Sequence, residues 1–175
     1  MYLRLAFHFL LALFLSIFQL TFIQPLFSWA GHFNLVLVVL VFVLALSGFD
    51  KALIWALTLG FGYDIYNFLP FGFFMICFLV TVIIAEFLLR NFFTDKSLYS
   101  LLALTFFVAF VFEFLFYSGT YVVSWYSRDI ALFLIQKEFW LMFFQGVLWN
   151  SVAAFVFFYF FNFVSNRLNA VFLKH

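Results

Sequence analysis

Long apolar runs, separated by short clusters of charged residues, Pro, Gly and Asn, dominate this chain. A helix needs roughly 20 mostly apolar residues to cross the hydrocarbon of a bilayer. Six runs fit this pattern, and they cover residues 5–23, 34–49, 52–69, 71–89, 98–117 and 139–164. Because backbone groups in lipid must be hydrogen-bonded within the protein, runs this long and uniformly apolar predict helices and not the strands of a barrel.

The stretch YVVSWYSRDIALFLIQKE, between the fifth and sixth runs, has a different pattern. It is too polar to span a bilayer and too apolar to lie free in water. Trp125 and Tyr126 beside Arg128 suit the level of the lipid headgroups. We therefore expect a short interfacial helix here. No repeat or linker divides the chain, so residues 1–175 are predicted to form a single membrane domain, a bundle of six helices.

Composition supports this fold class. Hydrophobic residues make up 69% and charged residues 9% of the chain, and the mean hydropathy is +1.23, whereas about a quarter of the residues of soluble proteins are charged. The net charge of +1, with no basic cluster, argues against nucleic acid as a partner. The apolar run at the N-terminus is too long for a signal peptide and is not followed by a small-residue cleavage site, so we interpret it as a retained span.

Basic residues in the short loops predict the orientation, because Lys and Arg are concentrated on the cytoplasmic side. With six spans, one side receives Arg4, Lys51, Arg90, Lys96, Arg167 and Lys174, and the other receives Arg128 and Lys137. Both termini are therefore predicted to be cytoplasmic. A five-span alternative would leave Arg167 and Lys174 on the outer side, which fits the rule less well.

The stretch GFGYDIYNFLPFG places a carboxylate, Asp64, within a predicted membrane span. A carboxylate near the middle of a bilayer is penalised by roughly 2 to 4 kcal/mol. Gly60 and Gly62 permit close approach of a neighbouring helix, and Pro70 ends a helix. Such a broken helix end is one way to build an intramembrane site. The alternative is an ordinary hairpin whose turn is capped by Asp64 and Asn67.

Three further polar residues, Glu86, Glu113 and Asn150, lie within predicted spans. Glu86 precedes Arg90 by four residues, which predicts an ion pair along one helix near the cytoplasmic surface. Glu113 has no basic residue within a helical turn. It is either protonated and hydrogen-bonded to another helix, through Asn150 or Gln145, or it lines a polar cavity.

No pattern of catalytic or metal-binding residues is recognisable. His8, His32 and His175 are scattered over different segments, and Cys77 is the single cysteine. No metalloprotease, nucleophile-elbow or phosphate-loop motif occurs. We therefore expect neither an enzyme nor a bound metal or cofactor.

The run NLVLVVLVFVLALSGFDKALIWALTLGFGYDIYNFLPFGFF resembles the bacterial rod-shape-determining MreD family, in which a Gly-rich span leads to an Asp and a Pro-Phe-Gly turn. The matching positions are Gly48, Gly60, Asp64, Pro70, Phe71 and Gly72. NFFTDKSLYSLLALT, after the fourth span, continues the likeness, which covers about residues 33–105.

The resemblance implies a protein of the bacterial cytoplasmic (inner) membrane, with five or six spans and a fold related to the substrate-binding subunits of energy-coupling-factor vitamin transporters. It also implies a non-enzymatic scaffold of the cell-elongation machinery. The partners of such a scaffold would be an MreC-like protein, the cytoskeletal protein MreB, and the peptidoglycan synthases RodA and a class B penicillin-binding protein. In that setting Asp64 would be the polar anchor of an outer hairpin.

The alternative function is a transporter subunit that captures a small vitamin-like ligand from outside. A transporter subunit of this kind requires Asp64, Glu113 and Asn150 to line one outward-facing cavity. Because a scaffold and a transporter subunit both predict the same six-helix bundle, the fold alone does not separate them.

Overall fold

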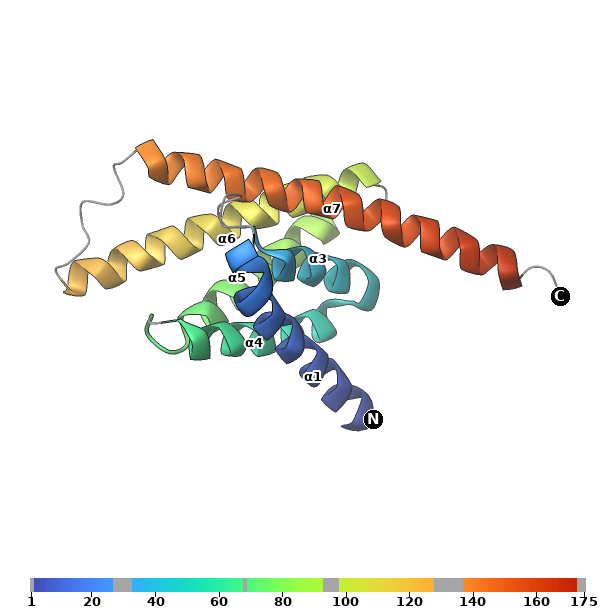
Figure 1. The fold of residues 1–175 in the computed structure, drawn as a ribbon, viewed down its shortest axis with the longest axis horizontal. Helices are drawn as coiled ribbons and strands as arrows, with labels where there is room; N and C mark the ends of the chain where they lie inside the picture. The colour runs from blue at the N-terminus through green and yellow to red at the C-terminus, as the bar shows by residue number, and fades with distance from the viewer. Residues whose placement is uncertain (1, 27–32, 68, 93–97, 128–136, 173–175) are drawn as a thin grey trace.

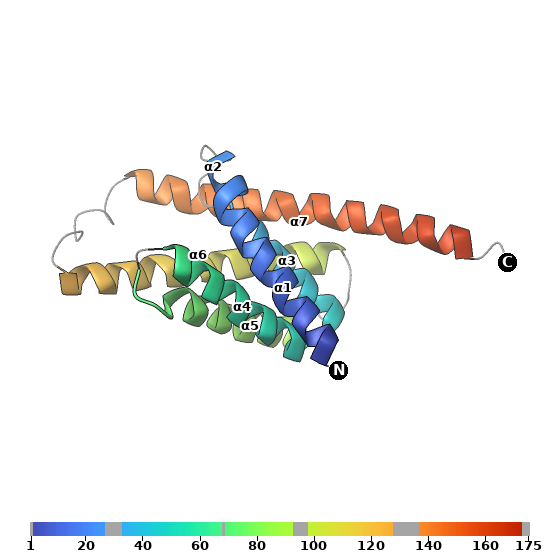
Figure 2. The same cartoon turned by 60° about the horizontal axis from the view of Figure 1, so that its bottom comes forward.

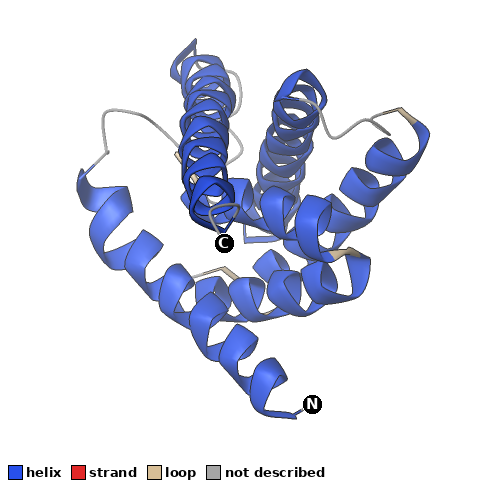
Figure 3. Ribbon diagram, turned by 90° about the vertical axis from the view of Figure 1, so that its right-hand side faces the viewer, coloured by secondary structure: helices blue, strands red, loops and turns tan. Residues whose placement is uncertain are grey.

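The computed structural model describes residues 2–26, 33–67, 69–92, 98–127 and 137–172, and within these ranges it is helical with no strand. The elements are α1 (Tyr2–Phe18), the π-helical turn η1 (Gln19–Ile23), α2 (Gln24–Leu26), α3 (Leu35–Ser47), α4 (Phe49–Tyr66), α5 (Phe73–Asn91), α6 (Leu98–Ser127) and α7 (Lys137–Phe172) (Figure 1). Figure 3 shows the same helices in a view along the long axis of the molecule. The predicted all-α fold class is confirmed at this level.

Four helical segments are long and apolar enough to cross a bilayer, which indicates a multi-pass membrane protein. They are Ala6–Leu26, Phe73–Asn91, Ser100–Val123 and Phe143–Phe160. The other two predicted spans are also helices, but α3 has only 13 residues, and α4 carries Asp50, Lys51 and Asp64 within its 18 residues.

The short helix α3 lies at the centre of the bundle and contacts α4, α5, α6 and α7. A helix that is surrounded in this way is expected to be apolar on all sides, and the sequence LVLVVLVFVLALS meets that expectation. The longer helices α6 and α7 run antiparallel beside each other (Figure 2). The helices α4 and α5 form a second antiparallel pair, against which α1 packs through α4.

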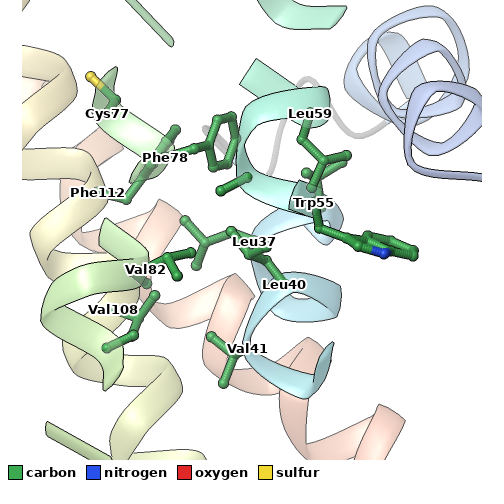
Figure 4. Close-up of a cluster of buried hydrophobic side chains, with 14 of the residues drawn as sticks. Leu37, Leu40, Val41, Trp55, Leu59, Cys77, Phe78, Val82, Val108 and Phe112 are labelled. Atoms are coloured by element: carbon green, nitrogen blue, oxygen red, sulfur yellow. The ribbon is translucent and has the colours of Figure 1, made fainter. Parts of the chain in front are cut away.

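The core forms where these helices meet. Leu37 of α3 and Phe78 of α5 are fully buried, and the rings of Phe78 and Phe112 of α6 lie 4.8 Å apart (Figure 4). Cys77, also in this cluster, is buried as a packing residue. Because lipid tails are as apolar as these side chains, close van der Waals packing is what holds such a core together in a membrane.

The segment after the fifth predicted span differs from the expectation. We expected a break at Ser118, Gly119 and Thr120 and a separate interfacial helix after it, but α6 continues without interruption to Ser127. The two hydroxyl groups donate to carbonyls of the preceding turn, and the Gly119 backbone faces the Phe73 ring, where a β-carbon would collide. Gly119 therefore belongs to a contact with α5, and the three residues do not break the helix.

The expected interfacial segment, residues 121–138, is distributed over α6, α7 and residues outside the described ranges. Residues 121–127 belong to α6, and Lys137 begins α7. Arg128 and the other residues of 128–136 lie outside the described ranges, as do Lys96, Lys174, His32 and His175.

Candidate functional site

Asp64, near the end of α4, caps the beginning of α5. Its Oδ1 accepts a hydrogen bond from the backbone N–H of Phe74 at 2.8 Å, and its Oδ2 accepts from Gly72 at 3.1 Å and Met75 at 3.2 Å. The first N–H groups of a helix have no partner within the helix and carry partial positive charge, so a carboxylate satisfies them well. Asp64 is 5% exposed. This geometry agrees with the hairpin interpretation of Asp64.

The turn between α4 and α5 depends on its glycine and proline. Gly72 has a φ of 95°, a left-handed conformation that side-chain-bearing residues rarely adopt. The carbonyl of Pro70 accepts a hydrogen bond from the Phe73 N–H at 3.1 Å. Asn67 closes the other side of the turn, because its side chain donates to the Tyr63 carbonyl at 2.9 Å. Hydrogen bonds of Asn67, Pro70 and Phe73 thus hold the two helix ends on either side of the turn.

Gly60 and Gly62 both allow close helix contacts, but with different helices. A β-carbon on Gly60 would lie 2.5 Å from the Met75 Cα of α5, and a β-carbon on Gly62 would overlap the side chain of Ser16 on α1. Gly60 therefore belongs to the α4–α5 hairpin, whereas Gly62 belongs to the α1–α4 contact. Phe71 is 68% exposed at the turn, and its ring packs edge-on against Phe61 at 6.0 Å.

Glu86 lies apart from this hairpin. Arg90 Nε donates to Glu86 Oε1 in the predicted i to i+4 arrangement, and the Arg90 side chain is 73% exposed. The pair therefore runs along one helix with Arg90 exposed and Glu86 partly buried, and it takes no part in the polar cluster that follows.

A buried polar cluster joins α1, α3, α4 and α7 at the beginning of α3. Gln19 donates to the Phe33 carbonyl at 2.8 Å and accepts from the Leu35 N–H at 3.1 Å. Asn34 caps α3 and also accepts from the Tyr63 hydroxyl at 3.2 Å. Gln19 begins the π-helical turn η1, a local irregularity that is frequent at functional sites. The cluster fixes where the chain enters α3.

Asn150 of α7 completes this cluster. Its Oδ1 accepts from the Asn34 N–H at 2.8 Å, and its side chain is fully buried. Its Nδ2 has no hydrogen-bond partner among the described residues. Asn150 therefore supports α3 and does not bond to Glu113, which was one of the two alternatives for that carboxyl group.

A cavity of about 100 Å³ opens beside the cluster. Its polar lining consists of Gln19, Gln24, Asn34, Tyr63, Asn67 and Glu113, and its aromatic lining consists of Phe33, Phe74, Phe112 and Phe116. Such a space exceeds the roughly 10–15 Å³ that one water molecule needs. The cavity lies where α1 and α4 end and where α3 and α5 begin.

Glu113 is 1% exposed, and neither carboxyl oxygen has a hydrogen-bond partner among the described residues. Gln145, the other partner considered for it, is exposed on α7. The second alternative, a carboxyl group that lines a polar cavity, is the one that agrees with the structure.

The polar residues singled out in the sequence therefore do not converge on one site. Glu113 lines the cavity, Asp64 caps α5 outside the lining, and Asn150 holds the backbone of Asn34. Sequence reasoning missed Gln19 and Asn34. The available signal was an amide inside the first apolar run and another at the start of the second.

The described residues hold no group of three or more His, Cys, Asp or Glu side chains that could bind a metal ion. His8 of α1 accepts from the indole N–H of Trp55 at 3.4 Å, a contact between α1 and α4. No family model, no curated protein and no solved structure matches the chain.

Proposed function

We propose that the chain is a non-enzymatic scaffold of the bacterial cell-elongation machinery, similar to MreD, in the inner membrane. The α4–α5 hairpin is the observation that carries this proposal. Gly60, Asp64, Pro70 and Gly72, which carry the resemblance, each have a structural task in that hairpin. A carboxylate used by three backbone amides is not available for chemistry, but it fixes a shape that a partner can recognise.

The tip of the hairpin offers a contact for such a partner. Phe71 is exposed, whereas Asp64 and Phe74, which are hydrogen-bonded to each other across the hairpin, are buried. An exposed aromatic residue on a rigid support is a typical anchor of protein interfaces, because little conformational entropy is lost on binding.

We infer six membrane crossings with both termini cytoplasmic, an arrangement that would place this tip at the outer surface. The beginning of α1, the α3–α4 turn and the end of α7 point toward one end of the molecule in Figure 2. Arg4, Lys51 and Arg90 lie at helix ends of this side by sequence. The shorter helices α3 and α4 cross the bilayer surrounded by the other helices. They therefore contact less lipid and can be shorter and less uniformly apolar.

A second surface suits a partner that lies in the membrane. An apolar groove of about 720 Å³ runs between α6 and α7. Ala103 and Ser151 line it together with Phe106 and Phe155. Small residues allow the backbone of another helix to approach closely, so a groove of this kind fits a single transmembrane helix. We assign it to the MreC-like partner, with RodA, a class B penicillin-binding protein and MreB as further members of the assembly.

The transporter alternative is less well supported. It requires Asp64, Glu113 and Asn150 to line one outward cavity, and two of these three side chains are engaged in bonds to backbone amides elsewhere. A scaffold makes no such requirement.

Affinity purification of the tagged full chain from its own membranes, followed by mass spectrometry, tests the proposal. We expect a single-span MreC-like protein and the wall synthases to be recovered. The variant Phe71→Ala should reduce this recovery, whereas Phe87→Ala, at a residue that is 60% exposed on α5, should not. Recovery of an energising ATPase module in place of these partners would overturn the scaffold.

A further inference from the structure

The cavity beside α3 contains a buried carboxyl group, Glu113, for which the described residues provide neither an opposite charge nor a hydrogen bond. The carboxyl oxygens of Glu113 on α6 have no hydrogen-bond partner among the described residues, and the ion pair of Glu86 with Arg90 lies on α5, outside the lining of the cavity. A buried carboxylate without a partner is strongly unfavourable. A group from outside the chain that carries positive charge would remove this cost.

Three other polar side chains of the lining, Gln19, Tyr63 and Asn67, already take part in hydrogen bonds, and Gln24 is exposed. Both ends of the Gln19 amide bond to the backbone around α3, and the Tyr63 hydroxyl donates to Asn34. The Asn67 amide nitrogen donates to the Tyr63 carbonyl. Glu113 is therefore the strongest acceptor in the cavity that is still available to a ligand.

The rest of the wall near Glu113 is aromatic. Phe112 and Phe116 flank it on α6, and Phe74 faces the same cavity from α5. The rings of Phe74 and Phe116 lie 5.6 Å apart. Aromatic faces attract organic cations, and this attraction grows when water is excluded. Mg²⁺ or Ca²⁺ would instead require six or more oxygen ligands, which one carboxylate between phenyl rings does not supply.

We propose that this cavity binds the ammonium group of a small organic amine, with Glu113 as its counter-ion and the Phe rings as its walls. The ammonium comes either from a free amine or from the ethanolamine headgroup of a phospholipid. The position of the cavity, at the end of the bundle where α3 and α5 begin, gives access from the headgroup region under the six-crossing arrangement. This binding site goes beyond the scaffold role and does not depend on it.

The test uses the full chain in nanodiscs of pure phosphatidylglycerol, which lacks an ammonium group. Ethylammonium chloride is added, with sodium chloride at equal ionic strength as the control. We expect the unfolding midpoint to rise by about 4 °C or more and to saturate with ethylammonium. Glu113→Gln should abolish this rise, whereas Glu86→Gln, which removes a carboxylate that is paired with Arg90 outside the cavity, should retain it.

A parallel set of nanodiscs with phosphatidylethanolamine identifies the source of the ammonium group. A midpoint that is already raised there, in a manner that requires Glu113, supports the lipid headgroup. A rise only with added ethylammonium supports a free amine. If neither lipid nor amine gives an effect that depends on Glu113, the proposal is overturned.

A second variant keeps the test decisive if Glu113→Gln does not fold. Phe116→Leu retains an apolar side chain but removes an aromatic face from the cavity. It should raise the ethylammonium concentration needed for half of the effect by about threefold or more. An unchanged concentration dependence in Phe116→Leu would contradict the aromatic wall and with it the proposed site.

Discussion

Asp64 on α4 accepts a hydrogen bond of 2.8 Å from the backbone N–H of Phe74 on α5, so one side chain ties the end of one helix to the beginning of the next. Two further N–H groups, of Gly72 and Met75, bond to the same carboxylate. This relationship determines how firmly the hairpin tip with Phe71 is held, and it leads to the first prediction.

Asp64→Ala should lower the free energy of unfolding by about 2 kcal/mol, because three N–H groups lose their acceptor. Asp64→Asn, which keeps one acceptor oxygen, should lose about half as much. Thermal unfolding of the detergent-solubilised variants measures both effects. We expect membrane insertion to be nearly normal and partner recovery to fall, since the defect concerns the shape of a hairpin. Unchanged partner recovery and cell shape in Asp64→Ala would contradict a role of this hairpin in assembly.

Gly60→Ala should destabilise the α4–α5 pair by about 1 to 3 kcal/mol, because the new methyl group meets the Met75 backbone and not a flexible side chain. Ser118→Ala, at an exposed position of α6, is a matched control and should change stability by less than about 0.5 kcal/mol. Equal unfolding midpoints for the two variants would show that the close approach of α4 and α5 is not required.

Glu113→Gln should raise the stability of the ligand-free protein by about 1 to 2 kcal/mol, because an uncompensated buried carboxyl group is replaced by a neutral amide. Glu86→Gln should lower stability by at most about 0.5 kcal/mol, since it breaks a surface pair along one helix. Unfolding in phosphatidylglycerol nanodiscs compares the two. A Glu113→Gln variant that is less stable than the parent under these conditions would indicate a structural partner for the carboxyl group.

Asn34 and Tyr63 should be energetically coupled. Asn34→Ala removes both the cap of α3 and the acceptor for the Tyr63 hydroxyl, and should cost about 2 kcal/mol. Tyr63→Phe should cost about 1 kcal/mol. A double-mutant cycle measures the coupling, and the two losses should add to more than the loss in the double variant. Strict additivity would mean that the two side chains do not interact.

The hairpin could be anticipated from the sequence because its determinants are local. Gly60, Asp64, Pro70 and Gly72 lie within one short stretch, and each residue type has a known conformational preference at a helix end. The ion pair of Glu86 with Arg90 is equally local. In both places spacing along one or two neighbouring helices contains the necessary information.

The cavity could not be anticipated in the same way. Gln19, Asn34 and Glu113 come from three helices, and nothing in their spacing shows that α3 begins beside α6. The break expected at Gly119 was wrong for a similar reason. The glycine is needed for a close contact with Phe73, which is distant in the sequence. Where the conformation at a residue depends on a contact with a residue far along the chain, local conformational propensity alone gives an incomplete prediction.

The helix α7 is longer than a single crossing of the bilayer requires. A helix of 36 residues is about 54 Å long, whereas the hydrocarbon layer is about 30 Å thick. Even with the tilt that membrane helices commonly show, a length of about 20 Å is left for the headgroups and the water beyond them. Figure 1 shows the last turns of α7 extending past the other helices. In the proposed scaffold role, this rigid extension would set how far from the bilayer surface a partner is held.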